Sequence, residues 1–566
     1  MKRAAELRNQ LKEIHRRSYP AYKTLRGEYH FGEYILSIDH VQGDPFASPS
    51  SLSVRVSLTD AAFPEKYYRE PWCRIALQDH LTRLFGKQIQ QFSFQARGSG
   101  KSGLISVSRC GQEILERTAC EITDKDIILR FKVGFPANGR TINAPELEKI
   151  LFDFLPRSLE QSLWYRNLNK KALEQTWALA QDQAYIRRQL KERNLCAFVA
   201  DGSILPRQSG VSDLPMKDAI PFSSPDSLRI TMDLPHHGPV SGMGISQGIT
   251  LIVGGGYHGK STLLQALERG VYSHISGDGR EYVITDHSAL KLRAEDGRSI
   301  RHVDISMFIN DLPNKKDTRD FSTPDASGST SQAANIVEGL EAGTRLFLID
   351  EDTSATNFMV RDTFMQQIIS RSKEPITPFL ERALDIYRKA GCSTILVAGS
   401  SGAFFHIADT VIQMDCYRPV DITAKVREAC KDYPIDFQKV PPFVLPDYQR
   451  VLQPSRPGKG RQGQPDRTKI KIHDKDSFLI GKESVDLRYV EQLVDQEQTA
   501  ALACLLKYAM ENLADGRRTL REIVSLLETR IRQKGIGSFS DTPYISSGLA
   551  VPRIQEIYSC INRYRG

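Results

Sequence analysis

The sequence predicts an α/β fold around a phosphate-binding loop, flanked by an N-terminal α+β region and a C-terminal, mainly helical domain. Two observations predict the central part. One apolar run leads into a glycine-rich loop at 254–262, and another ends in two acids at 350–351. A third observation, apolar residues at helical spacing beyond residue 487, predicts the C-terminal domain.

The glycine-rich loop satisfies the pattern Gly-x-x-x-x-Gly-Lys-Ser/Thr between an apolar run and a helical pattern, the setting that this motif needs. Backbone N–H groups of such a loop and the following helix N-terminus attract phosphate. We expect Lys260 to reach the β- and γ-phosphates of ATP and the Ser261 hydroxyl to bind Mg²⁺. The residues expected to bind nucleotide are Gly254, Gly255, Gly256, Tyr257, His258, Gly259, Lys260, Ser261 and Thr262.

A second glycine-rich stretch, Gly98 to Gly103, has a similar composition but not the same pattern. Gln95 stands where the first glycine of the motif is required. We interpret this stretch as a basic turn, with a phosphate contact as an option, and not as a second nucleotide site.

The second apolar run, 346–349, is followed directly by Asp350 and Glu351. A buried strand of this kind delivers carboxylates to the C-terminal edge of an α/β sheet, where ligands bind. We expect Asp350 to hold Mg²⁺ through water and Glu351 to act as the base that deprotonates the attacking water.

A Ser/Gly stretch at 326–330 lies upstream of the two acids, and a helical stretch follows at 331–340. In ATP-binding-cassette proteins a signature sequence stands at this separation from the acidic strand, at a helix N-terminus. The loop 352–357 resembles the dimer-contacting loop of the same superfamily. The comparison implies that Ser327, Gly328 and Ser329 contact the γ-phosphate of ATP held by a second copy.

Five stretches together resemble the family of predicted ATPases of the ABC class, which is mostly bacterial and is similar to a mitochondrial RNA-processing ATPase. They are 254–262, 277–281, 293–298, 326–334 and 350–359, and the likeness extends to 41–47, 197–207 and 552–565. The resemblance implies a P-loop ABC-type ATPase core and a cytoplasmic homodimer that uses ATP and Mg²⁺. It also implies binding of RNA or another single-stranded nucleic acid.

Two elements of ordinary cassettes are missing. No glutamine stands where the γ-phosphate-sensing residue is expected, and Asn310 or Asp311 are the candidate substitutes. The strand at 394–397 runs into 398–401, where cassettes present a switch histidine; His406 and His258 are the candidates there. We therefore expect slow hydrolysis, or hydrolysis that needs a trigger.

Composition narrows the class of protein. The chain has 566 residues, 40% hydrophobic and 25% charged, which is typical of globular proteins with several domains. No apolar run approaches the length that spans a bilayer, and the N-terminus lacks the apolar core of a signal peptide. We expect no membrane contact and no transmembrane subunit. The nine scattered cysteines predict reduced thiols in a cytosol-like compartment and no metal site of their own.

The net charge of +8 is modest, so its distribution matters more than the total. A Pro/Gly-rich segment concentrates basic residues and suits phosphate-backbone contact, although a solvated linker is an equal alternative. The C-terminal domain adds two further basic candidates. The residues considered for nucleic-acid contact are Arg456, Lys459, Arg461, Arg467, Lys469, Lys471, Arg553 and Arg563.

Composition shifts predict four segments: an N-terminal region at 1–225, the ATPase core at 226–417, a basic connector at 418–485 and the C-terminal domain at 486–566. Strands are expected at 52–58, 104–108 and 127–133. Helices are expected at 146–195 with a break near Pro156, and at 487–508, 520–532 and 554–564.

One phosphate loop and one signature per chain, without an internal repeat, predict a two-fold homodimer closed around two ATP molecules. The favoured hypothesis is an ATP-driven clamp that binds or remodels RNA. Two alternatives stay open: a cassette ATPase that acts on a protein or ribosomal complex, and an ATP-dependent binding module with little hydrolysis.

Overall fold

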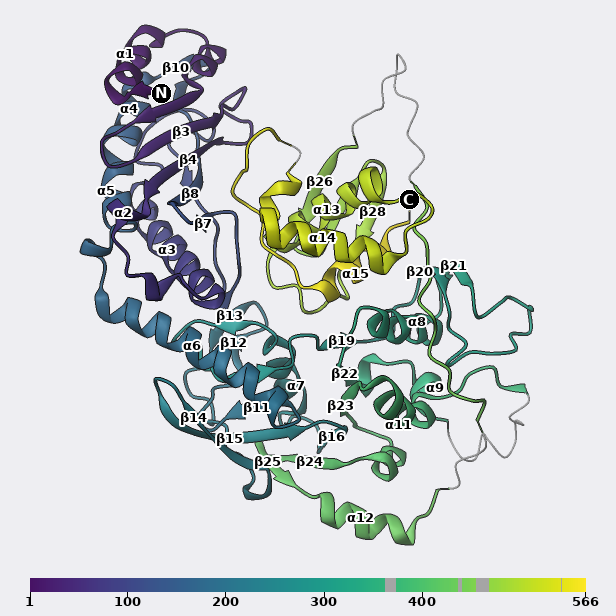
Figure 1. Ribbon diagram of the computed structural model, residues 1–566. Coiled ribbons are helices and arrows are strands. Elements are labelled where there is room, and N and C mark those ends of the chain that lie inside the picture. Colours follow the sequence, from purple (N-terminus) through teal and green to yellow (C-terminus); the bar gives the residue numbers. More distant parts are fainter. Residues whose placement is uncertain (362–372, 436–439, 455–467, 541, 566) are drawn as a thin grey trace. The chain divides into compact units, whose positions relative to one another are not determined.

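The computed structural model describes residues 1–361, 373–435, 440–454, 468–540 and 542–565 (Figure 1). Its contacts divide the chain into two compact units. Unit 1 comprises Met1–Gln181 and Arg530–Val551, and unit 2 comprises Asp182–Thr529 and Pro552–Gly566. Among the described residues, no helix combines the length and the apolarity needed to cross a bilayer.

Unit 1 is built on a mostly antiparallel sheet whose strands follow the order β1-β2-β3-β4-β8-β5, with β7 also paired to β8. Alternating apolar residues put Leu52, Val54 and Val56 of β4 into the core. The strands are β1 (Lys2–Arg3), β2 (Gly27–His30), β3 (Ile35–His40), β4 (Ser50–Ser57), β5 (Ile105–Ser106), β7 (Cys120–Ile122) and β8 (Asp126–Val133). A small hairpin, β9 (Ala137–Asn138) with β10 (Thr141–Ile142), follows β8.

Helices pack around this sheet and bury the aromatic residues Tyr19, Tyr22, Phe85, Phe131 and Phe135. They are α1 (Ala4–Ile14), α3 (Pro71–Phe92), α4 (Ala144–Lys149), α5 (Leu155–Glu160) and the first part of α6 (Lys170–Glu192). The helix break expected near Pro156 lies instead at 161–169. The chain stays helical through Pro156, because a π-helical segment, Ile150–Phe154, joins α4 directly to α5.

Unit 2 contains two larger sheets. An antiparallel sheet has the order β14-β15-β11-β18, and a second sheet has the order β19-β22-β23-β16-β24-β25. The first is formed by β11 (Leu195–Ala200), β14 (Arg229–Leu234), β15 (Gly238–Ser246) and β18 (Val283–Thr285). Because β11 belongs to this sheet, the division into units falls near residue 182, whereas the sequence predicts a boundary at 225.

The second sheet is parallel from β19 to β24, and only β25 runs antiparallel. Its strands are β16 (Ile249–Val253), β19 (Leu290–Leu292), β22 (Leu346–Asp350), β23 (Ser393–Val397), β24 (Thr410–Asp415) and β25 (Arg418–Asp421). Its helices are α7 (Lys260–Arg269), α8 (Gly328–Glu341), α9 (Thr356–Met359), α11 (Phe379–Ala390) and α12 (Thr423–Asp432), and β20 (Arg298–Val303) pairs with β21 (Phe321–Ala326). The strands are buried on both faces, as continuous apolar runs predict.

The C-terminal part of unit 2 combines a three-stranded sheet with helices. The sheet consists of β26 (Ile470–Asp474), β27 (Ser477–Ile480) and β28 (Glu483–Asp486), and α13 (Gln496–Tyr508) packs on it. Helix α15 (Ile554–Arg563) contacts α13 and α8, while α14 (Leu520–Lys534) continues from unit 2 into unit 1. The expected α/β core with a mainly helical C-terminal region is confirmed.

Candidate functional site

The loop between β16 and α7 is open to a phosphate. Gly254 and Gly259 have φ angles of 138° and 97°, which glycine adopts without strain, and a side chain at 254 would meet the Met414 carbonyl oxygen at 2.5 Å. Within the part of the chain that the structure describes, the N–H groups of 255–259 have no hydrogen-bond acceptor. The Lys260 ammonium donates to the carbonyl oxygens of Gly254 (2.7 Å) and Gly255 (2.8 Å). Unused N–H groups, a lysine and a helix N-terminus fit a phosphate chain.

Asp350 ends β22 at the carboxyl edge of the same parallel sheet. Strand β23 lies between β22 and β16, so the two strand ends are about 10 Å apart. Burial raises the pKa of Asp350, and the nearby Lys291 ammonium only partly opposes it. A buried carboxylate at this edge and the Ser261 hydroxyl at the start of α7 are oxygen ligands of the kind that Mg²⁺ prefers.

Glu351 is held by the loop that follows β23. Its carboxylate accepts hydrogen bonds from the N–H groups of Gly399 (2.6 Å) and Ser400 (3.0 Å) and from the Ser400 hydroxyl (2.6 Å). Burial alone would raise the pKa of Glu351, but these hydrogen bonds outweigh it and hold the pKa below its usual value. The expected base therefore binds the loop at 399–400, within the stretch 398–401 where the sequence resemblance implies a switch residue.

Ser327 caps the N-terminus of α8. Its backbone is extended, its side chain is exposed, and its hydroxyl lies 3.0 Å from the Thr330 hydroxyl. The predicted helix after the Ser/Gly stretch is thus present, with Gly328 as its first residue. The α8 N-terminus can offer N–H groups to an anion from another molecule.

Gln332, which the sequence analysis did not single out, ties α8 to the loop after the two acids. Its fully buried amide donates to the Ser354 hydroxyl (2.9 Å) and accepts from the Ala355 N–H (2.9 Å). Helix α8 and the loop at 354–355 are therefore joined by two hydrogen bonds of a buried side chain. The signal for this role in the sequence is weak: it consists of the position of Gln332 about one turn after the start of the predicted helix.

The candidate substitutes for the missing residues have local partners. The Asn310 amide donates to the Ser306 carbonyl oxygen (2.7 Å), and Asp311 is exposed. The His258 ring accepts from the Cys416 N–H (2.9 Å), and His406 lies in a short 3₁₀ helix after the Gly399–Ser400 loop. Their proposed roles in sensing nucleotide remain predictions.

The side chains of Arg553 and Arg563 form ion pairs within unit 2. Arg553 is 5% exposed, forms an ion pair with Glu556 (2.6 Å), and donates to the carbonyl oxygens of His287 (2.7 Å) and Ala289 (2.9 Å). Arg563 pairs with Glu295. Burial and these ion pairs argue against the predicted nucleic-acid contact of Arg553 and Arg563.

Of the other residues considered for nucleic-acid contact, two are exposed and four lie outside the described residues. Lys469 and Lys471 are exposed beside β27. Arg456, Lys459, Arg461 and Arg467 lie outside the described residues.

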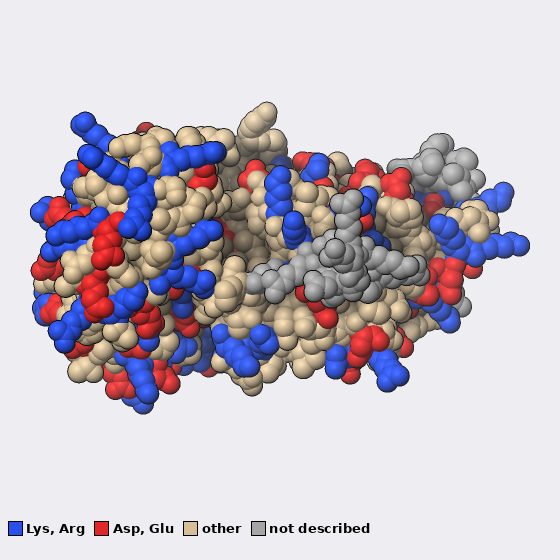
Figure 2. Space-filling model, turned by 90° about the horizontal axis from the view of Figure 1, so that it is seen from above, with Lys and Arg blue, Asp and Glu red and all other residues tan. Residues whose placement is uncertain are grey.

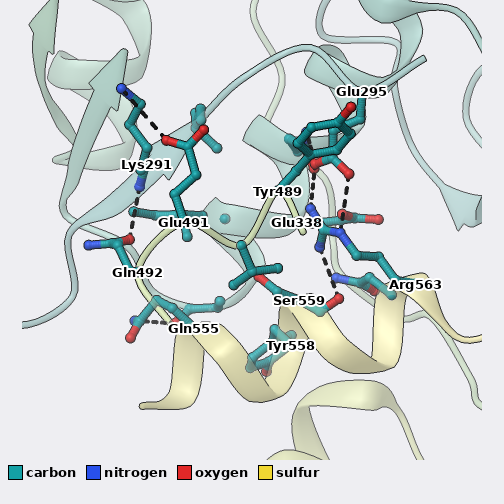
Figure 3. Close-up of a pocket in the computed structure, with 17 residues that line it drawn as sticks. Lys291, Glu295, Glu338, Tyr489, Glu491, Gln492, Gln555, Tyr558, Ser559 and Arg563 are labelled. Atoms are coloured by element: carbon teal, nitrogen blue, oxygen red, sulfur yellow. Dashed lines mark hydrogen bonds and ion pairs between the residues drawn. The ribbon is translucent and has the colours of Figure 1, made fainter. Parts of the chain in front are cut away.

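A small pocket in unit 2 is lined by residues of α8, of α15 and of the segment 489–492 (Figure 3). In Figure 3, Lys291 and Glu491 point toward one another; their charged atoms are 4.0 Å apart, and Arg293 approaches Glu491 at 2.7 Å. The space inside is about 20 Å³, room for about one water molecule. The pocket is a charged junction between the signature helix and the C-terminal elements, too small for a nucleotide.

Comparisons with known families match nearly the whole chain. The P-loop domain of the ABC ATPases matches residues 169–444, and the N-terminal domain of ABC-class ATPases matches residues 4–166. The chain belongs to the ABC class of ATPases. The C-terminal domain of MRB1590 matches residues 469–566, so this ABC-class ATPase has an MRB1590-like C-terminus.

Individual relatives of this ABC-class ATPase match a smaller part of the chain than the family models do. The uncharacterized protein MJ1628 of Methanocaldococcus jannaschii is 33% identical over 233 residues, 39% of this chain and 50% of that protein. The chain thus spans about half the length of this curated relative.

Solved ATP-binding cassettes of ABC transporters also match. One is MJ1267 in its ADP conformation (11% identity, TM-score 0.25, 42% of this chain and 95% of that chain). Another is cbiO1 of Clostridium perfringens (15%, 0.27, 42% and 93%). Scores this low carry no argument about function.

Proposed function

We propose that this ABC-class ATPase hydrolyses ATP between two copies of itself and uses the closing and opening of that dimer to hold single-stranded RNA. One observation carries the dimer: α8, whose N-terminus exposes Ser327, is hydrogen-bonded through Gln332 to the loop after Asp350 and Glu351. One P-loop and one signature per chain then make two equivalent composite sites in a two-fold pair.

Each residue of the site has a task that its position supports. The N–H groups of 255–259 and Lys260 bind the phosphates, and Ser261 and Asp350 would hold Mg²⁺, which neutralises phosphate charge. Glu351 deprotonates the attacking water once it leaves the Gly399–Ser400 loop. Ser327 of a second copy, with the N–H groups at Gly328 and Ser329, closes the site over the γ-phosphate.

The RNA part of the proposal has two supports. The sequence resembles a family similar to an RNA-processing ATPase, and Lys469 and Lys471 present exposed charge directly after the basic stretch 455–467.

One observation favours a second candidate, an ATP-dependent binding module with little hydrolysis. The expected base accepts three hydrogen bonds from its own chain, two on one carboxylate oxygen and one on the other, and these bonds favour the ionised carboxylate over the protonated form that proton transfer from water would produce. Under this alternative, ATP closes the dimer and the Gly399–Ser400 loop retains Glu351 even then.

Phosphate release by wild type and by Glu351→Gln separates the two candidates. We expect the substitution to lower the rate about 100- to 10,000-fold, the usual contribution of a general base, and to trap an ATP-bound dimer on size-exclusion chromatography. Glu428→Gln, which changes an exposed acid of α12, is the matched control and should leave the rate unchanged.

Equal rates near zero for wild type and Glu351→Gln would remove hydrolysis from the proposal and leave the binding module. A chain that stays monomeric with ATP in both forms would remove the shared site. A hydrolysing dimer that binds no single-stranded RNA at low salt would leave a protein or ribosomal complex as the partner.

A further inference from the structure

Two phenylalanine rings stand in water on neighbouring loops of unit 1. Phe46 is 62% exposed and Phe94 is 60% exposed. Each forgoes part of the 1.5–3 kcal/mol, roughly, that burial of such a side chain yields. Phe94 also has a φ of 65°, in the left-handed region that bulky residues avoid. Exposed rings on a strained backbone point to a role other than core packing.

The turn Gly100–Gly103 holds both rings in place. A side chain at Gly100 would meet the Pro45 carbonyl oxygen at 2.6 Å and the Phe46 ring at 2.9 Å, and one at Gly103 would meet the Ala96 carbonyl oxygen at 2.0 Å. The Lys101 N–H donates to the Pro45 carbonyl oxygen (2.9 Å), and the Phe94 N–H donates to that of Gly103 (2.7 Å). The rings therefore flank one tightly packed turn.

The side chain of Gln42, which is 1% exposed, holds the loop that carries Phe46 through hydrogen bonds. Its amide oxygen accepts from the N–H groups of Ser50 (3.2 Å) and Phe135 (3.3 Å), and its amide nitrogen donates to the Asp44 carbonyl oxygen (3.0 Å). A ligand that uses the Phe46 ring thus meets a loop that is already ordered, which lowers the entropy cost of binding.

Three basic residues lie on the turn at 97–101 and on the adjoining β9–β10 hairpin. Arg97 and Arg140 are exposed and Lys101 is half-buried; Ser99 joins their loop to the β9–β10 hairpin through the Ala137 carbonyl oxygen (2.7 Å). Arg140 pairs with Asp44 (2.9 Å), but its side chain stays 80% exposed and keeps further N–H donors. At the left of Figure 2, where the N-terminal elements of Figure 1 also lie, Lys and Arg side chains alternate with Asp and Glu side chains.

We propose that this surface, formed by Phe46, Phe94, Arg97, Lys101 and Arg140, binds single-stranded RNA. Unpaired bases stack on the two rings, and the three cations contact phosphates. The phosphates meet side chains and not the turn backbone, because the N–H groups of Ser99, Lys101, Ser102 and Gly103 already donate to carbonyl oxygens. The inference rests on the proposed function, to which it adds a location for the RNA outside the ATPase core.

The test is fluorescence anisotropy of a labelled oligouridylate with the full chain. Loss of one stacking ring weakens single-strand binding about tenfold, so Phe46→Ala and Phe94→Ala should each raise the Kd about tenfold, and the double variant more. Arg97→Ala with Lys101→Ala should reduce the slope of log Kd against log salt by about 0.7 for each phosphate that the protein no longer neutralises. Duplex RNA should bind less than the single strand.

Two matched controls guard the interpretation. Tyr433→Ala removes an exposed ring of unit 2, and Arg69→Ala removes an exposed cation of unit 1 away from the turn; neither should move the Kd. Thermal unfolding of each variant checks that unit 1 still folds.

The outcomes separate this surface from the proposed function. If the wild type binds the oligomer and the folded double variant Phe46→Ala/Phe94→Ala binds it equally, the surface is wrong while RNA binding stands. If the wild type hydrolyses ATP but binds no RNA, the RNA part of the function falls and the surface falls with it. Self-association of the wild type that the double variant abolishes, without RNA binding, would instead make this a protein–protein contact.

Discussion

The two glycine-rich loops of this protein have similar compositions and opposite hydrogen bonding. In the P-loop at 254–262, the N–H groups of 255–259 find no acceptor among the described residues. In the turn at 98–103, the N–H groups of Ser99, Lys101, Ser102 and Gly103 all donate to carbonyl oxygens of unit 1. The backbone N–H groups of the first loop can therefore bind a phosphate. Those four N–H groups of the second are already hydrogen-bonded, so the side chains of this turn are left to contact a ligand.

The difference arises from what flanks each loop. The P-loop links a buried parallel strand to the N-terminus of α7, so its N–H groups and the helix dipole converge on one point. The turn at 98–103 links α3 to the two-residue strand β5 and is packed against 134–139. Composition alone does not specify a phosphate site; the strand before the glycines and the helix after them do.

Lys260→Ala should give the largest effect. Lys260 now caps the carbonyl oxygens of Gly254 and Gly255, and in the nucleotide complex its charge moves to the phosphates. Loss of one preorganised donor of this kind lowers kcat about 100- to 1,000-fold. Steady-state phosphate release measures it, and an ATP affinity that falls on Lys101→Ala as well would contradict the contrast between the loops.

A substitution at Gly134 should give the next largest effect, on stability. A side chain there would meet the Lys101 carbonyl oxygen at 1.8 Å, so Gly134→Ala forces the backbone of the 98–103 turn to move and should cost about 3 kcal/mol of unfolding free energy. Gly139→Ala is the matched control: its φ is 60° with nothing within 4 Å, so only about 1 kcal/mol is expected.

Denaturant unfolding of both variants measures the difference. Gly256→Ala in the P-loop meets nothing within 4 Å, so it should leave stability unchanged. A stability loss at Gly256 equal to that at Gly134 would mean that the P-loop is packed as tightly as the turn.

The sequence predicted the parts of the fold that depend on local patterns. The β16–loop–α7 unit, the acidic end of β22 and the helix after Ser327 all follow from short-range periodicity and glycine placement. The pairing of β11 with β15 and β18 does not, because antiparallel partners far apart in sequence leave no local signal. The helix break predicted near Pro156 is wrong, because the helix continues across the proline from a π-helical segment at Ile150–Phe154, which the residue pattern does not indicate.

For the candidate site, too, the sequence predicts the residues that belong to local motifs but not their long-range partners. Lys260, Asp350 and Glu351 are specified by motif and strand, but the Glu351 partners at 399–400 come from a loop that only the folded sheet brings close. The burial of Arg553 and Arg563 also needs tertiary information, because their long-range partners are the carbonyl oxygens of His287 and Ala289 and the Glu295 carboxylate. The Arg553–Glu556 pair, by contrast, is local.

Ser400→Ala should give the smallest effect and sharpens the comparison within the ATPase site. The Ser400 hydroxyl donates to the Glu351 carboxylate at 2.6 Å, whereas the two other hydrogen bonds come from backbone N–H groups and survive the substitution. Removal of one hydrogen bond to a partly exposed carboxylate should destabilise this retained position by about 1 kcal/mol, so single-turnover hydrolysis should rise about fivefold. Ser401→Ala, which removes the neighbouring hydroxyl, is the matched control. A slower Ser400→Ala enzyme would mean that Ser400 positions Glu351 for proton transfer and that the contact persists when ATP is bound.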